Sequence, residues 1–281
     1  MAVFLDGRGL PTGTMQAIAK EMNFSETTFL LPAGTPGTDV RMRIFTPAEE
    51  LPTAGHPTIG TTFALARAGV IERGRTHFVF DCGIGPVPVA LTWKGDDLGF
   101  AWMTQSLPTF GDPVQDSART AAALSLPAAA IAAHPAQVVS CGVPFLFVPL
   151  TTRSAVDGVT VNNTGLDELL RATTPAAHGV FVFSTEPGDA PATVYSRMFA
   201  PELGVVEDPA TGIASGPLGC YLVRHKLVPA GKADAMISLQ GAKMGRPSHV
   251  HISIGVEQGG ITSVRVGGEA VLAGEATLYV P

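Results

Sequence analysis

The sequence predicts an α+β protein of two pseudo-symmetric domains, each a curled, mostly antiparallel sheet around a central helix. The first observation is an internal repeat, because RIFTP at residues 43–47 recurs in similar form as RMFAP at residues 197–201. The second is that each copy leads to a Pro-x-x-Gly segment that suits the start of a helix, at Pro57 and at Pro209. The third is that each half combines several short strand-like segments with one strongly apolar helix, which favours a curled sheet over a doubly wound fold.

Hydrophobic periodicity and turn residues locate the elements of the first half. Pro57 suits the first turn of an apolar helix, and Gly69 suits the position just beyond its end. Branched and aromatic segments bounded by Gly and Pro predict the strands. In chain order we expect a helix over 14–22, strands over 23–31 and 40–45, a helix over 57–67, and strands over 76–80, 85–91 and 98–103.

The second half begins after a connector-like segment at residues 109–116, so we divide the chain into residues 1–115 and 116–269. A last strand over 277–280 lies in the segment 270–281, which we expect to return to the first half. At 281 residues, two domains of ordinary size are expected. The second half should contain a helix over 118–124, strands within 137–150, a helix over 166–172, strands over 179–184 and 193–199, a helix over 213–225, and strands over 249–254 and 263–266.

Composition excludes several classes of function. The chain is 46% hydrophobic and only 15% charged, with a formal net charge of -6, so it has no electrostatic footprint for nucleic acid or an anionic membrane. No apolar run approaches the roughly 20 residues of a membrane span, and no charged-then-apolar signal segment opens the chain. We therefore expect a cytoplasmic protein whose partner is a small molecule.

The sequence contains no motif for a cofactor or a metal ion. No Gly-x-Gly-x-x-Gly follows a strand and no Walker loop occurs, so a nucleotide cofactor has no support. The three cysteines lack Cys-x-x-Cys spacing, which argues against a disulfide framework or a zinc site, and we expect buried thiols. His249 and His251 share one face of an expected strand, but no third ligand is evident. We expect neither cofactor nor metal.

Glu26 is the most informative carboxylate of the sequence. It is the only acid between Phe24 and Leu31, and hydroxyl residues flank it. Burial would raise its pKa, by up to roughly 3 to 5 units when complete, so Glu26 would act as base and acid near neutral pH. A surface-facing glutamate on an edge strand fits the same pattern.

Each expected helix start carries an ionisable residue, His56 in the first copy and Asp208 in the second. Unpaired backbone N–H groups and the helix dipole favour anions at a helix N-terminus, so a carboxylate held between the two helix starts is the expected ligand. The positive helix end should keep the His56 ring neutral, able to donate or relay a proton. Taken alone, His56 also suits a capping role and Asp208 an ordinary N-cap.

Three motifs together carry a family resemblance. They are N-x-S-E-T-x-F from residue 23, R-x-F-T-P-x-x-E-L-P-x-A-G-H-P-T-I-G from residue 43, and E-D-P-x-T-G from residue 207 followed by G-P-L-G. In them the chain resembles the phenazine biosynthesis PhzF-like family, and the likeness extends from residues 15–19 to residues 266–268. The resemblance implies a diaminopimelate epimerase-like fold, cofactor-free proton transfer in a site between the two halves, and a homodimer.

The resemblance also implies roles for individual residues. Glu26 matches the catalytic acid/base of the family, while His56 and Asp208 match residues that hold or protonate the substrate. Gly55 and Gly212 match the backbone donors at the two helix starts.

The chain departs from the family pattern at three places. Ile213 stands after Thr211 and Gly212 where the family often has serine, and losing this hydroxyl from the substrate-binding helix start should alter substrate contacts. Ala54 and, in the second copy, Ala210 to Thr211 stand where related racemases carry thiols, so two-thiol racemisation is not expected. The first residues of the chain resemble the second strand of the family, so we expect the first strand and one site residue to be missing and a sheet edge to be exposed.

The leading hypothesis is an isomerase in which Glu26 removes a proton alpha or vinylogous to a carboxylate and returns it elsewhere. One alternative is an epimerase or racemase of an amino or hydroxy acid that uses Glu26, His56 and Asp208 in place of thiols. The other is a small-molecule binding protein that kept the scaffold and lost the chemistry.

Overall fold

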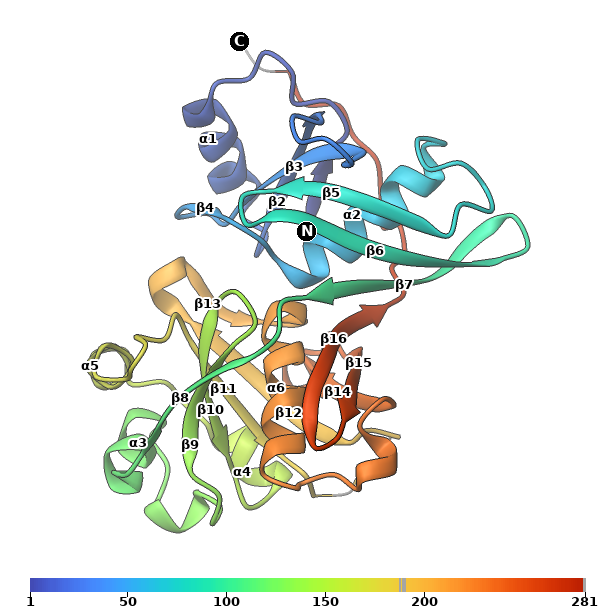
Figure 1. Cartoon of the computed structure of the whole chain (residues 1–281). Coiled ribbons are helices and arrows are strands. Elements are labelled where there is room, and N and C mark those ends of the chain that lie inside the picture. The colour runs from blue at the N-terminus through green and yellow to red at the C-terminus, as the bar shows by residue number, and fades with distance from the viewer. Residues whose placement is uncertain (187, 189–190, 280–281) are drawn as a thin grey trace.

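Two lobes make up the described part of the chain (Figure 1). The computed structural model describes residues 1–186, 188 and 191–279. The first lobe contains β1 (Ala2–Phe4), α1 (Thr12–Met22), β2 (Thr27–Pro32), β3 (Val40–Phe45), β4 (Glu50–Leu51), α2 (Gly55–Arg67), β5 (His77–Cys82), β6 (Gly85–Lys94) and β7 (Asp97–Gln105).

The second lobe holds the remaining elements. Its helices are α3 (Ser117–Ala123), α4 (Arg153–Gly158), α5 (Asn163–Arg171) and α6 (Gly212–Arg224), with short 3-10 helices at Ala128–Ala130, Pro201–Leu203, Ala230–Lys232 and Ala242–Met244. Its strands are β8 (Thr109–Val114), β9 (Ala136–Ser140), β10 (Pro144–Pro149), β11 (Val180–Ser184), β12 (Val194–Ala200), β13 (Val205–Asp208), β14 (Met236–Gln240), β15 (Ser248–Glu257) and β16 (Gly260–Gly268).

In the described residues, the strands form one continuous 16-stranded sheet. Its order is β1-β2-β3-β5-β6-β7-β16-β15-β14-β12-β11-β10-β9-β8, with β4 beside β3 and β13 beside β12. β7 and β16 pair antiparallel where the two lobes meet, so the sheet passes from one lobe into the other without a break (Figure 1).

A central helix lies in each lobe, as the sequence predicts. α2 and α6 are each 13 residues long and lie within the curl of their own part of the sheet (Figure 1). In the first lobe, Ile59 and Leu65 of α2 pack in one cluster with Phe78 and Phe80 of β5. The predicted α+β fold of two curled sheets, each around a helix, is confirmed.

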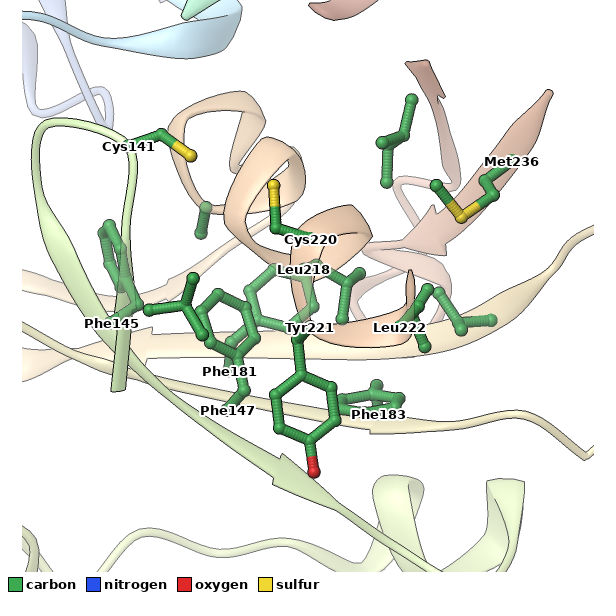
Figure 2. Close-up of a cluster of buried hydrophobic side chains, with 14 of the residues drawn as sticks. Cys141, Phe145, Phe147, Phe181, Phe183, Leu218, Cys220, Tyr221, Leu222 and Met236 are labelled. Atoms are coloured by element: carbon green, nitrogen blue, oxygen red, sulfur yellow. The ribbon is translucent and has the colours of Figure 1, made fainter. Parts of the chain in front are cut away.

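The larger core surrounds α6 (Figure 2). Leu218 and Tyr221 of this helix are fully buried and pack with Phe147, Phe181 and Phe183 from β10 and β11. The Tyr221 and Phe183 rings meet edge to face with centroids 5.5 Å apart, a geometry that aromatic quadrupoles favour. This packing holds α6, and therefore its first residue, rigidly against the sheet.

The echoed motifs occupy equivalent positions in the two lobes. Arg43 on β3 binds Glu50 on β4 through two parallel hydrogen bonds of 2.7 and 2.6 Å. Arg197 on β12 binds Glu207 on β13 in the same way, through two bonds of 2.8 Å. Each pair ties a long strand to the short strand that leads into the central helix, so the repeat visible in the sequence is a repeat of structure.

The expected connector over residues 109–116 is wrong, because β8 fills most of it and pairs antiparallel with β9. Gly111 and Pro113 obscure the strand pattern, and proline is tolerated because β8 is the last strand of the sheet order. Since β8 belongs to the second lobe, we propose that the division lies between β7 and β8.

The prediction of a last strand over 277–280 is also wrong for the residues that the structure describes. Residues 269–279 form no strand but run along the first lobe (Figure 1), where Glu275 lies 3.5 Å from Arg67 of α2. Val271 and Tyr279 are 93% and 90% exposed, so the segment has no apolar face to press against a sheet. We propose that this segment belongs to the first half, where it forms an irregular tail.

Two simpler expectations can be compared directly with the structure. Cys82, Cys141 and Cys220 are all buried and unpaired, which confirms the prediction of buried thiols. Among the helices of the described residues, none has the length and hydropathy of a membrane span.

Candidate active site

The starts of α2 and α6 meet between the two lobes. Gly55 is the first residue of α2 and Gly212 the first of α6, and their backbones approach so closely that neither position has room for a side chain. Neither helix has a side-chain cap, and the N–H groups of Gly55, His56 and Ile213 take part in none of the hydrogen bonds found among the described residues. Free N–H groups at two facing helix ends are able to bind an anion.

Three ionisable side chains from three elements gather at this point. Glu26 immediately precedes β2, His56 is the second residue of α2, and Asp208 ends β13. His56 Nε2 lies 2.9 Å from Glu26 Oε2, and His56 Nδ1 lies 4.0 Å from Asp208 Oδ2. Glu26 is 8% exposed and Asp208 2%. The structure thus brings together all three residues that the sequence singled out, and the alternative of a surface-facing Glu26 is wrong.

His56 is held as an imidazolium by its two carboxylate neighbours. Burial alone would lower its pKa, but the negative charges of Glu26 and Asp208 raise the pKa to about 9. The expectation of a neutral ring is therefore wrong. The helix dipole acts as the equivalent of about half a charge at the helix end, whereas two carboxylates lie within 4.0 Å of the ring.

The site shifts the pKa values of the two carboxyl groups, Glu26 and Asp208, in opposite directions. Burial raises the pKa of Glu26, but the charge of His56 and contacts with His56 and Ser25 outweigh burial, so the net pKa is lowered. The expected upward shift is therefore wrong. For Asp208 burial outweighs the attraction of His56, and its pKa is raised. Glu26 is thus ionised more readily than an ordinary glutamate, and Asp208 keeps its proton to a higher pH than an ordinary aspartate.

Thr211 and Ile213 complete the start of α6. The Thr211 hydroxyl donates to Asp208 Oδ2 over 2.6 Å, so this side chain is engaged with the acid. The Ile213 side chain lines the cavity beside the trio, where it adds apolar surface. Asp208 is not a regular N-cap, because its side chain reaches only the N–H of Ala210, at 3.4 Å.

A cavity of about 30 Å³ lies between the helix starts and the trio. That volume holds about one or two water molecules and is far below the roughly 300–1,000 Å³ of a typical ligand pocket. Six residues that line this cavity were not predicted from the sequence: Thr46, Leu51, Phe145, Met198, Ala200 and Val205. The repeat offered a signal for two of them, because Thr46 and Ala200 occupy the same position in the two repeated motifs.

The trio has the residue types of a metal site, and its candidate ligand atoms lie within 4.8 Å of one another. A histidine must be neutral to bind a metal ion, and the carboxylates raise the pKa of His56 to about 9, so a metal ion would have to displace a proton from this ring. The two ring nitrogens of His56 also face different carboxylates. The arrangement suits proton transfer.

Comparison with known proteins identifies relatives over the full chain. A family model described as phenazine biosynthesis-like protein matches residues 1–276. An uncharacterized isomerase of Mesorhizobium japonicum is 36% identical over 100% of this chain and 93% of its own length. A trans-2,3-dihydro-3-hydroxyanthranilate isomerase of Pseudomonas aeruginosa is 34% identical over the same shares.

Solved structures agree with this relationship. A protein described as a predicted epimerase of Pseudomonas aeruginosa superimposes with a TM-score of 0.83 at 33% identity, over 99% of this chain and 93% of that one. A probable proline racemase of Agrobacterium radiobacter has a TM-score of 0.65 at 12% identity, over 97% and 83%. The second likeness concerns the fold alone, which is the diaminopimelate epimerase-like type that the sequence predicts.

Proposed function

The chain belongs to the phenazine biosynthesis-like family of isomerases, and on this premise we propose that it moves a proton between two carbons of a small carboxylate substrate, with Glu26 as the proton carrier. The main support for this proposal is the 2.9 Å contact between buried Glu26 and His56. It favours the ionised form of Glu26 at neutral pH, which is the form a general base needs. The relatives named as isomerases support the reaction class.

In the proposed reaction, Glu26 removes a proton from a carbon alpha or vinylogous to the substrate carboxylate. The C–H bond breaks, an O–H bond forms on Glu26, and the electron pair enters the conjugated system. The double bond then shifts, a second carbon takes the proton back, and Glu26 is ionised again. No oxidant, reductant or cofactor is needed, because the substrate and product differ only in the position of one proton and the double bonds.

The substrate carboxylate would lie against the free N–H groups of Gly55, His56 and Ile213. This position suits an anion because both helix dipoles point their positive ends toward it. His56 adds a positive charge at the same point. The apolar wall formed by Ile213 and its neighbours favours a substrate with a flat or apolar body beside the carboxylate.

Substrate binding in this proposal requires movement. The cavity of about 30 Å³ is too small for a cyclic carboxylate, so the wall or the two lobes must separate to admit it. Closure afterwards would exclude water and strengthen the charges around the reacting carbon.

An epimerase is the second candidate, and one observation favours it. Glu26 and Asp208 lie on opposite sides of His56, one with a lowered and the other with a raised pKa. Two carboxyl groups whose pKa values are shifted in opposite directions suit the roles of base and acid in removing a proton from one face of a carbon and delivering one to the opposite face.

We also propose that the protein is a cytoplasmic homodimer, as its family resemblance implies. Sedimentation equilibrium measures the mass of the native particle. A mass near twice that of one 29.0 kDa chain is expected, and a mass near that of one chain contradicts the proposal.

The experiment that tests the function is proton NMR of trans-2,3-dihydro-3-hydroxyanthranilate with the protein in deuterated water. The wild type should move a double bond and place deuterium on the receiving carbon. Glu26→Gln should lower the rate by about 10²–10⁴-fold, because the amide cannot accept the proton. Glu49→Gln is the matched control, since Glu49 is an exposed glutamate of the same lobe.

Each result of this experiment has one meaning. Full turnover in Glu26→Gln would show that Glu26 is not the proton carrier. Deuterium at a stereocentre without movement of a double bond would favour the epimerase. If the wild type does not react, this probe is not its substrate. Ile213 at the helix start, in place of a hydroxyl residue, would account for that result.

A further inference from the structure

Gln240, at the end of β14, makes three hydrogen bonds within the turn that carries Asp208. Its Oε1 accepts from the N–H of Thr211 over 2.9 Å. Its Nε2 donates to the carbonyl of Asp208 and to the hydroxyl of Thr211, each over 2.7 Å. Gln240 is 0% exposed and Thr211 4%, so no water competes for these bonds. The sequence offered no reason to select Gln240, which follows from the fold alone.

The orientation of this amide is fixed by chemistry. The backbone N–H of Thr211 can only donate, so it must face Oε1 of Gln240, and Nε2 must then face the two oxygens. The Thr211 hydroxyl therefore accepts from Gln240 and has its own proton left to donate. That proton has one acceptor, Asp208 Oδ2, at 2.6 Å. Each hydrogen bond from Gln240 through Thr211 to Asp208 therefore has a defined donor and a defined acceptor.

The backbone around Gln240 is shaped to make this contact. The next residue, Gly241, has φ 75°, and a Cβ built on it would lie 2.7 Å from the carbonyl oxygen of Pro209. Glycine is therefore required for β14 to approach the Asp208–Pro209 turn this closely. The end of β14 and the Asp208–Pro209 turn therefore pack backbone against backbone.

We propose that Gln240 is a positioning residue that aims the Thr211 hydroxyl at Asp208 Oδ2 and so confines the transferable proton of Asp208 to Oδ1. Oδ2 receives a hydrogen bond that a protonated oxygen would disrupt, whereas Oδ1 has only a long 3.4 Å contact with the N–H of Ala210. That this proton is transferred in a reaction rests on the proposed function. That Oδ2 accepts a hydrogen bond and leaves Oδ1 to carry the proton when Asp208 is protonated rests on the hydrogen-bond geometry.

Three charged groups besides this network act on Asp208. His56 on α2 attracts it and favours its ionised form, Glu26 before β2 repels it, and the N-terminal ammonium of Met1 also attracts it. All three remain in place when Gln240 or Thr211 is changed. Changes in Asp208 titration in such variants therefore report on the Gln240–Thr211 chain.

The test is the pH titration of the Asp208 carboxyl carbon by ¹³C NMR in the full-length protein without substrate, with Asp208→Asn used for assignment. Thr211→Val removes the aimed hydroxyl and should raise the titration midpoint by about one unit or more, whereas Thr211→Ser keeps the hydroxyl and the wild-type midpoint. Gln240→Met removes the aiming donor without adding a charge and should shift the midpoint in the same direction as Thr211→Val.

Ser238→Ala is the matched control for Gln240. Ser238 lies two residues earlier on β14, is equally buried, and bonds Ser196 rather than the site. It should lower stability without moving the Asp208 midpoint. Equal midpoints in Thr211→Val and Thr211→Ser, or a shift in Ser238→Ala as large as in Gln240→Met, would overturn the proposal. Because no substrate is present, failure here is distinct from failure of the proposed isomerisation.

Discussion

Gly55 and Gly212 meet backbone against backbone at the start of the two central helices. A Cβ built on Gly55 would lie 2.3 Å from the Cα of Gly212, and one built on Gly212 would lie 2.9 Å from the Cα of Gly55. Both distances are well below the roughly 3.5–4.0 Å at which carbon atoms pack. The contact brings His56, the residue after Gly55, close to Asp208, which precedes α6.

Gly55→Ala should therefore separate the two helix starts. We expect the free energy of unfolding to fall by about 1–3 kcal/mol, because the added methyl group overpacks a fixed contact. Gly13→Ala in α1 is the control, since no heavy atom lies within 4 Å of its added Cβ, and it should stabilise by about 0.5–1 kcal/mol. Urea denaturation measures both, and equal effects would contradict the tight contact.

Stability should depend on pH through His56. The pKa of this residue is raised from 6.5 to about 9, so its contribution is complete below pH 6.5 and is lost as the pH rises through about 9. The wild type should lose at most about 3 kcal/mol over this window. Denaturation at a series of pH values should show a flatter profile for His56→Gln. The control His77→Gln replaces an exposed histidine and should keep the wild-type profile.

The two Arg–Glu pairs should differ in strength because they differ in burial. Arg197 and Glu207 are 9% and 13% exposed, whereas Arg43 and Glu50 are 16% and 37% exposed. Glu207→Gln should cost on the order of 3 kcal/mol, because it leaves a buried guanidinium without its counter-charge. Glu50→Gln should cost about 1 kcal/mol or less. Thermal unfolding compares the two, and equal losses would show that burial does not set their strength.

Ile213 should control substrate choice at the start of α6. Ile213→Ser introduces a hydroxyl and removes apolar wall, so we expect a lower KM for trans-2,3-dihydro-3-hydroxyanthranilate. Ile213→Ala removes similar bulk without adding a hydroxyl and separates the two effects. The same fall in KM for both variants would point to space rather than hydrogen bonding. Both should lose stability, by about 2–5 kcal/mol for the alanine variant, because Ile213 is 8% exposed.

Secondary structure was most predictable where the local pattern was strong. α2 and α6 begin within two residues of their expected starts, since Gly and Pro mark helix ends by their own backbone preferences. β8 was missed because Gly111 and Pro113 break the strand pattern, and only pairing with β9 makes the segment a strand. β14, which carries Gln240, was missed for a similar reason: its partners lie at residues 194–196 and 248–252.

The sequence by itself determined the duplication, the family, and the three candidate residues Glu26, His56 and Asp208. It did so because motifs and helix-start residues are local features of the chain. Only the tertiary structure decided their charge states. A pKa depends on the distances between groups, and these three come from the turn before β2, from α2 and from β13. Once the fold brings them together, the opposed charges outweigh both burial at Glu26 and the helix dipole at His56.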